Sequence, residues 1–497
     1  MKPRTVVIGS GFSGLAAACT LAHQGNQVIL VEKNHETGGR ARAFRTNGFV
    51  FDMGPSWYWM PEVFEAFFAR FGKKVSDYYS LVRLDPSYRV FFADREVDIP
   101  ADKQELKKLL DSIEPGAGEQ LDKFLAEAKV KYDTGMGEFV WKPSLSIMEF
   151  ADLRLLRESF RLQLFSNMSA HLRKFFRHPE IIQLLEFPVL FLGAKPERTP
   201  ALYSMMNYAD IELGTWYPKG GMYKIAEGMT KLAEELGVEI ITGAAVEKIA
   251  VNTAGRADGV VVNGELIEAD VIIGAADYHH IETKLLPKEA RSYSDKYWEK
   301  RVMSPSSLLF YLGVNKKISG LLHHNLFFDE SFGDHASEIY DTPKWPSKPL
   351  FYVCVNSKTD AEAAPEGMEN VFILIPVAPG MTSTEAERQK YLDMVLDRLE
   401  KRTGENVRDH IVYQRSFAHE EFISEYNSFK GNAYGLANTL LQTAFLKPRM
   451  RSKKVKNLFF AGQLTVPGPG VPPSLISGQL AASEVNIYVN DLKPVTA

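Results

Sequence analysis

The sequence predicts an α/β protein in which a Rossmann-like domain with a parallel sheet is joined by an α+β domain and a helical insertion. Three observations support this fold class: the chain opens on a strand, a helix and a second strand; two later blocks repeat a strand beside a glycine-rich loop; and the composition is that of a folded protein. Hydrophobic residues make up 45% of the chain and charged residues 24%. At about 150 residues per domain, 497 residues allow about three structural units.

Charge and cysteine content narrow the possible functions. The chain has 58 Lys and Arg against 62 Asp and Glu, and a net charge of -4 is too weak to indicate nucleic acid as the principal partner. Cys19 and Cys354 are the only cysteines, so their spacing offers no disulfide framework, redox pair or zinc-ligand cluster, and no metal is expected. A reducing, cytoplasmic setting is the default. No apolar run is long enough to span a bilayer.

The first element is a short strand that ends in a glycine-rich turn. Thr5-Val6-Val7-Ile8 is the β-branched run of a buried parallel strand, and Gly9-Ser10-Gly11-Phe12-Ser13-Gly14 follows it directly as G-x-G-x-x-G. A helix is expected from Leu15 to Gln24, with Gly25 as its stop, and then a second strand from Gln27 to Val31. These elements make one complete βαβ unit.

The glycines and the acidic residue after the second strand indicate a dinucleotide site. Gly9 permits the tight turn, Gly11 leaves room for a pyrophosphate against the backbone, and Gly14 lets helix and strand pack closely. The helix N-terminus then faces the phosphate charge. Glu32 stands where a carboxylate accepts hydrogen bonds from the ribose hydroxyls, so an adenosine without a 2′-phosphate is expected.

A second glycine pair helps to decide which dinucleotide the chain binds. Gly38-Gly39-Arg40 follows soon after Glu32-Lys33, placed to lie over a pyrophosphate or the far end of a longer ligand. Here the chain resembles the two-dinucleotide-binding flavoproteins, and the resemblance implies FAD. Because no second complete G-x-G-x-x-G with an acidic partner is present for NAD(P)H, we expect an organic substrate to reduce the flavin. Oxygen, a quinone or another diffusing acceptor would reoxidise it.

The second nucleotide-associated block begins at Trp216–Met222. An amphipathic helix with Ile225, Met229, Leu232 and Leu236 on one face is expected next, then a strand from Glu239 to Thr242, with Val246 shortly after it. The runs Gly259–Val262 and Asp270–Asp277 are expected to return to the first sheet as short buried strands. In similar flavoproteins such a segment completes the FAD domain.

The third block lies near the C-terminus. Asn457–Gln463 reads as a strand ending in glycine, followed by a loop over Gly468–Ser474 and a helix from Leu475. This arrangement aims backbone N–H groups at an anion or at the flavin. Gln463 stands where related flavoproteins usually have an acidic or small residue.

The stretch Gly48–Pro61, which contains Asp52-Met53-Gly54-Pro55-Ser56, resembles the carotenoid (phytoene) desaturase family, as does the C-terminal Pro-Gly-x-Gly-x-Pro loop. The resemblance covers the chain end to end. Trp57, Tyr58 and Trp59 are tunnel or flavin-packing aromatics only by this resemblance. The predicted cofactor contacts, from the motif and from the resemblance, are Gly9, Ser10, Gly11, Phe12, Ser13, Gly14, Glu32, Lys33, Gly38, Gly39, Arg40, Gly54, Pro55, Ser56, Val246, Gly462, Gln463, Gly470, Val471 and Pro472.

The resemblance implies FAD-dependent desaturation of a long isoprenoid hydrocarbon by hydride transfer to flavin, with phytoene converted towards lycopene as the leading expectation. The alternatives are a desaturase of another carotenoid or of dehydrosqualene, a flavin-dependent carotene isomerase, an amine oxidase, and a non-enzymatic FAD or lipid carrier. The absence of a cysteine after Cys354 counts against a covalent-flavin amine oxidase. His279, His280, Glu186 and Asp52 are conceivable proton acceptors, but no catalytic residue is assigned.

Domain boundaries and membrane association are also expected from the pattern and the resemblance. The FAD domain is assigned to 1–75, 216–285 and 453–497, the substrate domain to 76–130 and 286–452, and a helical lid or membrane-associating region to 131–215. Within the last, residues 151–177 carry an apolar stripe at helical spacing beside a basic row of Arg154, Arg157 and Arg161. Similar desaturases are peripheral membrane proteins, so we expect a cytoplasmic enzyme bound to the cytoplasmic membrane.

Overall fold

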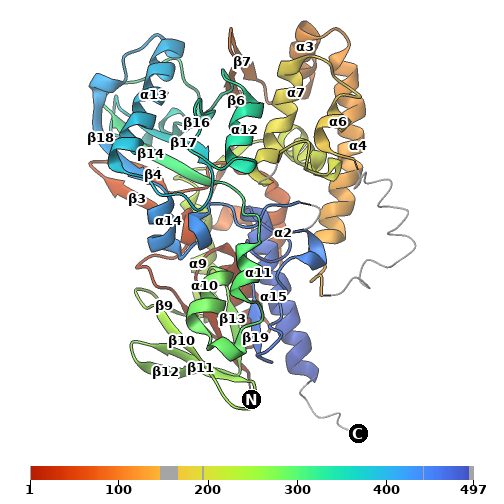
Figure 1. The fold of residues 1–497 in the computed structure, drawn as a ribbon, viewed down its shortest axis with the longest axis vertical. Coiled ribbons are helices and arrows are strands. Elements are labelled where there is room, and N and C mark those ends of the chain that lie inside the picture. Colours follow the sequence, from red (N-terminus) through yellow and green to blue (C-terminus); the bar gives the residue numbers. More distant parts are fainter. Residues whose placement is uncertain (1, 146–165, 193–194, 440–441, 492–497) are drawn as a thin grey trace.

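A five-stranded parallel sheet forms the lower part of the molecule in Figure 1. The computed structural model describes residues 2–145, 166–192, 195–439 and 442–491. The strand order is β19-β13-β1-β2-β9, and every neighbouring pair is parallel. The strands are β1 (Arg4–Ile8), β2 (Gln27–Val31), β9 (Glu239–Ile241), β13 (Val271–Gly274) and β19 (Leu458–Phe460). The three predicted nucleotide-associated blocks therefore do meet in one sheet.

Three helices cover this sheet, and glycines let two of the helix contacts close. α1 (Phe12–His23) packs between α15 (Val471–Asp491) and α9 (Tyr223–Glu235). A Cβ on Gly478 of α15 would lie 2.1 Å from the carbonyl oxygen of Ser13, so the two helices approach at backbone distance. A Cβ on Gly14 would lie 1.9 Å from the oxygen of Gly9, which is the close helix and strand packing predicted for the third glycine.

A separate antiparallel sheet corrects one sequence prediction. Residues 259–262 do not return to the first sheet, because β11 (Ala257–Val262) pairs with β10 (Val246–Val251) and β12 (Glu265–Glu268) instead. The turn between β11 and β12 is Asn263-Gly264, with φ of 53° and 77°. An Asn-Gly pair with positive φ at both positions is the preferred two-residue hairpin turn, so the signal for antiparallel pairing was present in the sequence. The prediction for residues 270–277 was right, since β13 joins the parallel sheet.

A seven-stranded mixed sheet occupies the upper left of Figure 1. Residues alternate along its central strand: Leu308 and Phe310 pack with Leu392 of α13 (Glu385–Thr403) in one core, whereas Leu309 and Tyr311 belong to the core on the opposite face. That opposite face looks toward the nucleotide region. The strand order is β18 (Ile411–Phe417), β14 (Ser306–Val314), β17 (Glu369–Val377), β16 (Phe351–Cys354), β15 (His324–Phe327), β6 (Tyr88–Phe91) and β7 (Glu96–Ile99).

Helices make up the upper right of Figure 1. They are α3 (Lys103–Ile113), α4 (Ala117–Gly137), α6 (Met168–Leu172), α7 (Pro179–Glu186) and α8 (Met205–Tyr208). The helical stripe expected over residues 151–177 is not one continuous helix in its described part, 166–177: the side chain of Asn167 accepts from the N–H of Ala170 at 2.7 Å and starts the five-residue α6. Arg154, Arg157 and Arg161 lie outside the described residues. Within the described part of the chain, no helix is both long and apolar enough to span a membrane.

Shorter elements connect these regions. β3 (Ala43–Thr46) and β4 (Phe49–Asp52) form a hairpin, and β5 (Leu81–Arg83) pairs with β8 (Trp216–Pro218). Further helices are α2 (Pro61–Ala69), α10 (Tyr278–His280), α11 (Asp295–Glu299), α12 (Phe332–Tyr340) and α14 (His419–Tyr426). The domain boundaries given above stay a prediction.

Candidate functional site

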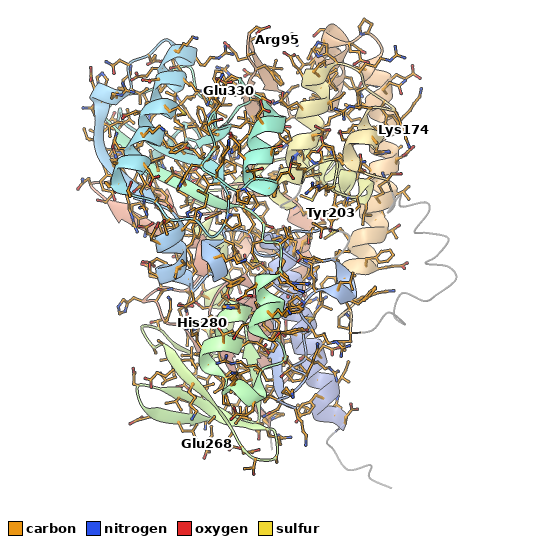
Figure 2. All side chains as sticks on the ribbon, viewed as in Figure 1. Arg95, Lys174, Tyr203, Glu268, His280 and Glu330 are labelled. Carbon is orange, nitrogen blue, oxygen red and sulfur yellow. The ribbon has the colours of Figure 1, made fainter. Side chains whose placement is uncertain are left out.

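One cavity of about 950 Å³ begins at the carboxyl ends of the parallel strands and continues between the helical region and the seven-stranded sheet. Gly9, Glu32, Ala275 and Ala461, which follow β1, β2, β13 and β19, all line it. Two lining residues labelled in Figure 2 come from opposite sides, Tyr203 from the helical region and His280 from the nucleotide region. Of the predicted cofactor contacts, all except Ser10 and Gly14 line this cavity.

The glycine-rich loop leaves open space where a pyrophosphate is expected. Gly9 has φ of 97°, a left-handed conformation that glycine adopts without strain. Gly11 has an ordinary φ of −66°, and a Cβ built on it would meet no protein atom within 4 Å. Packing within the protein therefore does not require a glycine at position 11. The space beside Gly11 belongs to the cavity.

Glu32 lies at the end of β2, is 4% exposed, and lines the cavity. One carboxylate oxygen accepts from the backbone N–H of Ser10 at 2.9 Å and from its hydroxyl at 2.7 Å. The other accepts from the backbone and side-chain nitrogens of Asn34, both at 2.9 Å. Ser10 thus acts on the site through Glu32, because it fixes the carboxylate that the sequence assigned to the ribose. Lys33, beside it, donates to the carbonyl of Ser424 at 2.6 Å.

Arg40 brings a buried cation to the same cavity. Its guanidinium donates to Ser428 and stands 5.2 Å from the ring centre of Tyr426. Its Nε has no hydrogen-bond partner among the described residues. Burial lowers the pKa of this guanidinium and the charge of Asp277 opposes that effect. An unfilled donor on a buried cation suits an anionic ligand such as a pyrophosphate.

Asp277 is a cavity residue that the sequence analysis did not assign to the site. Its carboxylate accepts from the N–H of His280 at 3.1 Å and from that of Phe429 at 3.3 Å, and burial raises its pKa to about 6. The signal was available, because Asp277 follows β13, and the carboxyl ends of neighbouring parallel strands meet at one edge of the sheet.

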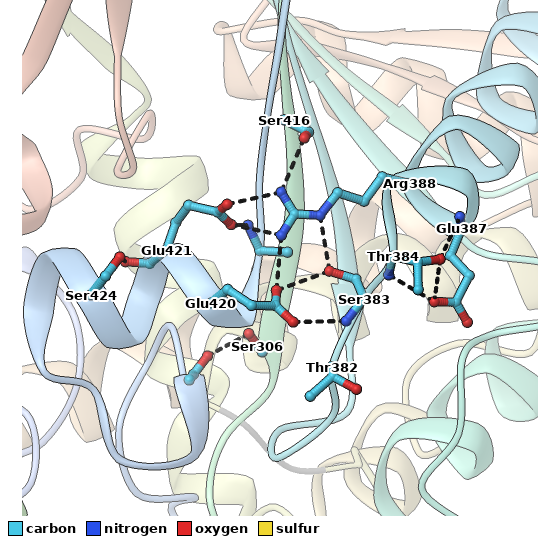
Figure 3. Close-up of polar contacts among 12 residues, drawn as sticks. Ser306, Thr382, Ser383, Thr384, Glu387, Arg388, Ser416, Glu420, Glu421 and Ser424 are labelled. Carbon is cyan, nitrogen blue, oxygen red and sulfur yellow. Dashed lines mark hydrogen bonds and ion pairs between the residues drawn. The ribbon is translucent and has the colours of Figure 1, made fainter.

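α14 is held against the cavity by a charged cluster, drawn in Figure 3. Arg388 of α13, only 7% exposed, donates to both carboxylate oxygens of Glu421 at 3.0 and 2.9 Å and to Glu420 at 2.8 Å. Ser383 and Ser416 accept its other hydrogen bonds. The same helix presents Tyr426 to the cavity beside Arg40. The cluster fixes the helix that closes this side of the site.

The C-terminal block contributes the predicted loop and helix. Gly462 has φ of 111°, and its N–H donates to the hydroxyl of Ser477 at 2.9 Å. Gln463 lines the cavity and donates to Asn432 at 3.2 Å. α15 begins at Val471, earlier than the predicted start at Leu475. Its first turn, which includes Pro472 and Pro473, lines the cavity, and the N–H of Ser474 donates to the carbonyl of Gly470 at 3.0 Å.

The part of the cavity away from the glycine loops is apolar. Trp57 and Trp59 line it together with Met136, Val140 and Met206. Tyr58 does not: it is 1% exposed and stacks on Phe64 with ring centres 4.6 Å apart. The three consecutive aromatics therefore divide between the cavity wall and the core.

Of the conceivable proton acceptors, His280 alone lines the cavity. His279 packs on Phe429 instead. Glu186 pairs with Arg173 at 3.3 Å, and Asp52 accepts from the N–H groups of Met222 and Tyr223. Since His280 stands at the nucleotide end beside Asp277, no catalytic base is assigned.

The geometry fits a dinucleotide: an open cradle at Gly11, a buried carboxylate at Glu32, a buried guanidinium with a free donor, and an apolar extension of the same cavity. Residues 12–486 match the family of flavin containing amine oxidoreductases. Cyclohexylamine oxidase from Brevibacterium oxydans has the same fold, with a TM-score of 0.61 at 16% identity over 99% of this chain and 100% of that one.

Two curated relatives narrow the family further. A carotenoid 3,4-desaturase from Haloarcula japonica is 43% identical over 481 residues, which are 96% of each protein. A zeta-carotene-forming phytoene desaturase from Myxococcus xanthus is 33% identical over 503 residues, covering 99% of this chain and 96% of that protein. This chain thus belongs to the flavin containing amine oxidoreductases and, within them, to the carotenoid desaturases: it is an FAD-dependent oxidoreductase that acts on CH–CH groups.

Proposed function

We propose that the carotenoid substrate lies in the apolar part of the cavity, with the bond to be desaturated beside the flavin. The observation that carries this proposal is the continuity of the cavity, which runs from Gly11 to Trp57, Met136 and Tyr203 as one volume of about 950 Å³. An apolar site with few polar groups binds a hydrocarbon mainly by excluding it from water.

Desaturation requires little acid or base catalysis from the protein. When bound, FAD supplies a hydride acceptor at N5. Loss of a hydride from one carbon to the flavin and of a proton from its neighbour to solvent would break two C–H bonds and form one C=C bond. The chain's own residues orient the polyene and keep water away: Trp57 and Trp59 present flat apolar faces, and Met136 and Met206 are flexible enough to fit an extended chain.

For the substrate, we propose 3,4-desaturation of a carotenoid ahead of desaturation of phytoene. The support is the 43% identity to the carotenoid 3,4-desaturase, against 33% to the phytoene desaturase, at similar coverage. Phytoene remains the second candidate, because the match to the phytoene desaturase covers 99% of this chain.

Purified FAD-loaded enzyme would be incubated in liposomes with phytoene, lycopene or dehydrosqualene, each with an added quinone. Products would be separated by chromatography, and their masses would be measured by mass spectrometry. We expect loss of two hydrogens from lycopene at a higher rate than from phytoene. The reverse preference would favour the phytoene assignment, and a product of unchanged mass would indicate isomerisation. No reaction with any of the three, by enzyme that retains FAD, would contradict the substrate proposal.

We also propose that the enzyme is cytoplasmic, binds the cytoplasmic membrane peripherally, and passes its electrons to a quinone or to oxygen. Such a long hydrocarbon is held in lipid rather than in water, and a quinone would be available in the same layer. The basic row in the sequence at Arg154, Arg157 and Arg161 offers attraction to anionic lipid.

The membrane proposal is tested by replacing Arg154, Arg157 and Arg161 with Glu. Each cation near an anionic surface is worth about 1 kcal/mol, so loss of the three should weaken binding to anionic liposomes by at least about a hundredfold, and the added carboxylates should weaken it further, while flavin content stays unchanged. The matched control replaces the exposed Lys248, Lys454 and Lys456, near the β10–β12 sheet, with Glu. Equal sedimentation of both variants with liposomes would refute the role of the arginine row.

A further inference from the structure

Three side chains that can ligate a metal meet inside the seven-stranded sheet, apart from the flavin cavity. His323, His324 and Cys354 each offer one donor atom, and these atoms all lie within 4.8 Å of one another. Strand pairing brings them together, because His324 at the start of β15 is the direct antiparallel partner of Cys354 at the end of β16. All are buried, with exposed fractions of 5%, 0% and 2%.

Each imidazole has one nitrogen oriented by a hydrogen bond and one nitrogen without a hydrogen-bond partner among the described residues. Nδ1 of His323 lies 2.7 Å from the hydroxyl of Thr359, and Nδ1 of His324 lies 2.6 Å from the hydroxyl of Tyr352. Nε2 of each ring is buried and has no hydrogen-bond partner among the described residues. A histidine ligand in proteins typically shows this division, with one nitrogen oriented by a hydrogen bond and the other on the metal.

The thiol of Cys354 contacts an amide that is itself held by a carboxylate. Sγ of Cys354 lies 3.0 Å from the side-chain oxygen of Asn356, and the amide nitrogen of Asn356 donates to Asp52 at 3.1 Å. The thiol donates to Asn356 only while it carries its proton, so zinc binding, which needs the thiolate, would release this hydrogen bond along with the proton. On the other side, the ring of Tyr217 packs edge-on against His323 at 4.7 Å.

We propose that His323, His324 and Cys354 form a zinc site, with Nε2, Nε2 and Sγ as the three ligand atoms. Imidazole nitrogen and thiolate sulfur are the donors that Zn²⁺ prefers, at about 2.0–2.1 and 2.3 Å, with water in the fourth position. Tetrahedral bonds of that length put ligand atoms about 3.5 Å apart, so donors that lie within 4.8 Å of one another need to close by up to about 1.3 Å. Cysteine spacing alone predicted no zinc cluster, because the ligands are gathered by strand pairing and not by a C-x-x-C motif.

The site would brace the cavity wall. Trp57, which lines the cavity, stacks on His324 with ring centres 4.1 Å apart and planes 13° apart. A zinc ion would tie β15 to β16 directly behind this tryptophan. The inference stands independently of the substrate, since it needs only the three ligands.

The test uses the full-length, FAD-loaded protein without a histidine tag. The protein is incubated with Zn²⁺ and gel-filtered, and the molar ratio of zinc to protein is measured. X-ray absorption spectroscopy then identifies the atoms bound to the zinc and their distances. The informative variant is Cys19→Ser, which leaves Cys354 as the sole cysteine. We expect a single equivalent of zinc and a sulfur neighbour at about 2.3 Å in the wild type and in Cys19→Ser.

Cys354→Ser should lose the sulfur neighbour and the stoichiometric zinc. Thr359→Val, which keeps all three ligands but removes the hydrogen bond that orients His323, should bind zinc about tenfold more weakly. A wild type and a Cys19→Ser variant that retain FAD but carry no zinc, or zinc with nitrogen and oxygen neighbours only, would overturn the proposal. This readout does not depend on whether Cys354→Ser folds.

Discussion

At the scale of one residue, a substitution at Gly11 should impair cofactor binding without impairing folding. Its backbone is ordinary and a Cβ there meets no protein atom, so Gly11→Val should fold while its side chain occupies the pyrophosphate space. We expect the purified variant to be colourless, by absorbance, with an unchanged far-ultraviolet circular dichroism spectrum. Gly333→Val is the control, because Gly333 is exposed and also meets no atom within 4 Å. A yellow Gly11→Val protein would remove this loop from the phosphate site.

Asp210 makes stability depend on pH. It is 3% exposed, accepts from Tyr88 at 2.9 Å and from Thr215 at 3.0 Å, and burial raises its pKa from 3.8 to about 6. Because the folded pKa is above the unfolded one, its stabilising contribution is complete below about pH 4 and is lost as the pH rises through about 6. Asp210→Asn removes this dependence. Relative to wild type, the variant should gain about 3 kcal/mol between pH 4 and pH 7 in urea unfolding. A pH-independent difference would contradict the assignment.

At the scale of an element, the position of α14 depends on Arg388. Arg388→Met leaves Glu420 and Glu421 without their cation and should cost about 2 kcal/mol in urea unfolding, because these carboxylates are partly exposed. FAD affinity should fall as well, since α14 carries Tyr426 to the cavity. Arg408→Met, which breaks the exposed pair with Asp397, should cost less than about 1 kcal/mol and leave FAD affinity unchanged. Equal effects of the two variants would show that the cluster does not position α14.

Elements were predictable from sequence where their determinants are local. The β1, α1 and β2 unit follows from adjacent residues, and the glycine at position 14 predicted its close contact with Gly9. β11 was misplaced because its own sequence suits any buried strand, and the Asn263-Gly264 turn decides its partner. Arg40, Asp277 and Tyr426 meet only through the tertiary fold, so sequence spacing could not show that they share one cavity wall. The zinc-type cluster was missed for the same reason.

At the scale of the whole molecule, FAD should act as a bridge between regions. The cavity takes its walls from the nucleotide sheet, the seven-stranded sheet and the helical region. FAD at a hundred times its Kd adds about 2.7 kcal/mol to the stability of the folded state, or about 3 °C for a chain of this length. Calorimetry should show one transition that moves upward as a unit. Two transitions, of which FAD shifts one alone, would show that the regions unfold independently.

The order of strands in the parallel sheet also bears on how the protein is made. β1 and β2 leave the ribosome early, but β19 and Gly462, which complete the sheet edge and the cavity, come from residues 458–462. At about 5–20 residues per second, the sheet that begins with β1 and β2 waits roughly 20 to 90 s for its last strand, β19. During that time β13, whose outer neighbour is β19, is left as an edge of the sheet. A chain terminated before residue 458 contains the whole G-x-G-x-x-G motif and still lacks part of the cavity wall, so we expect such a chain to retain less FAD than the whole protein.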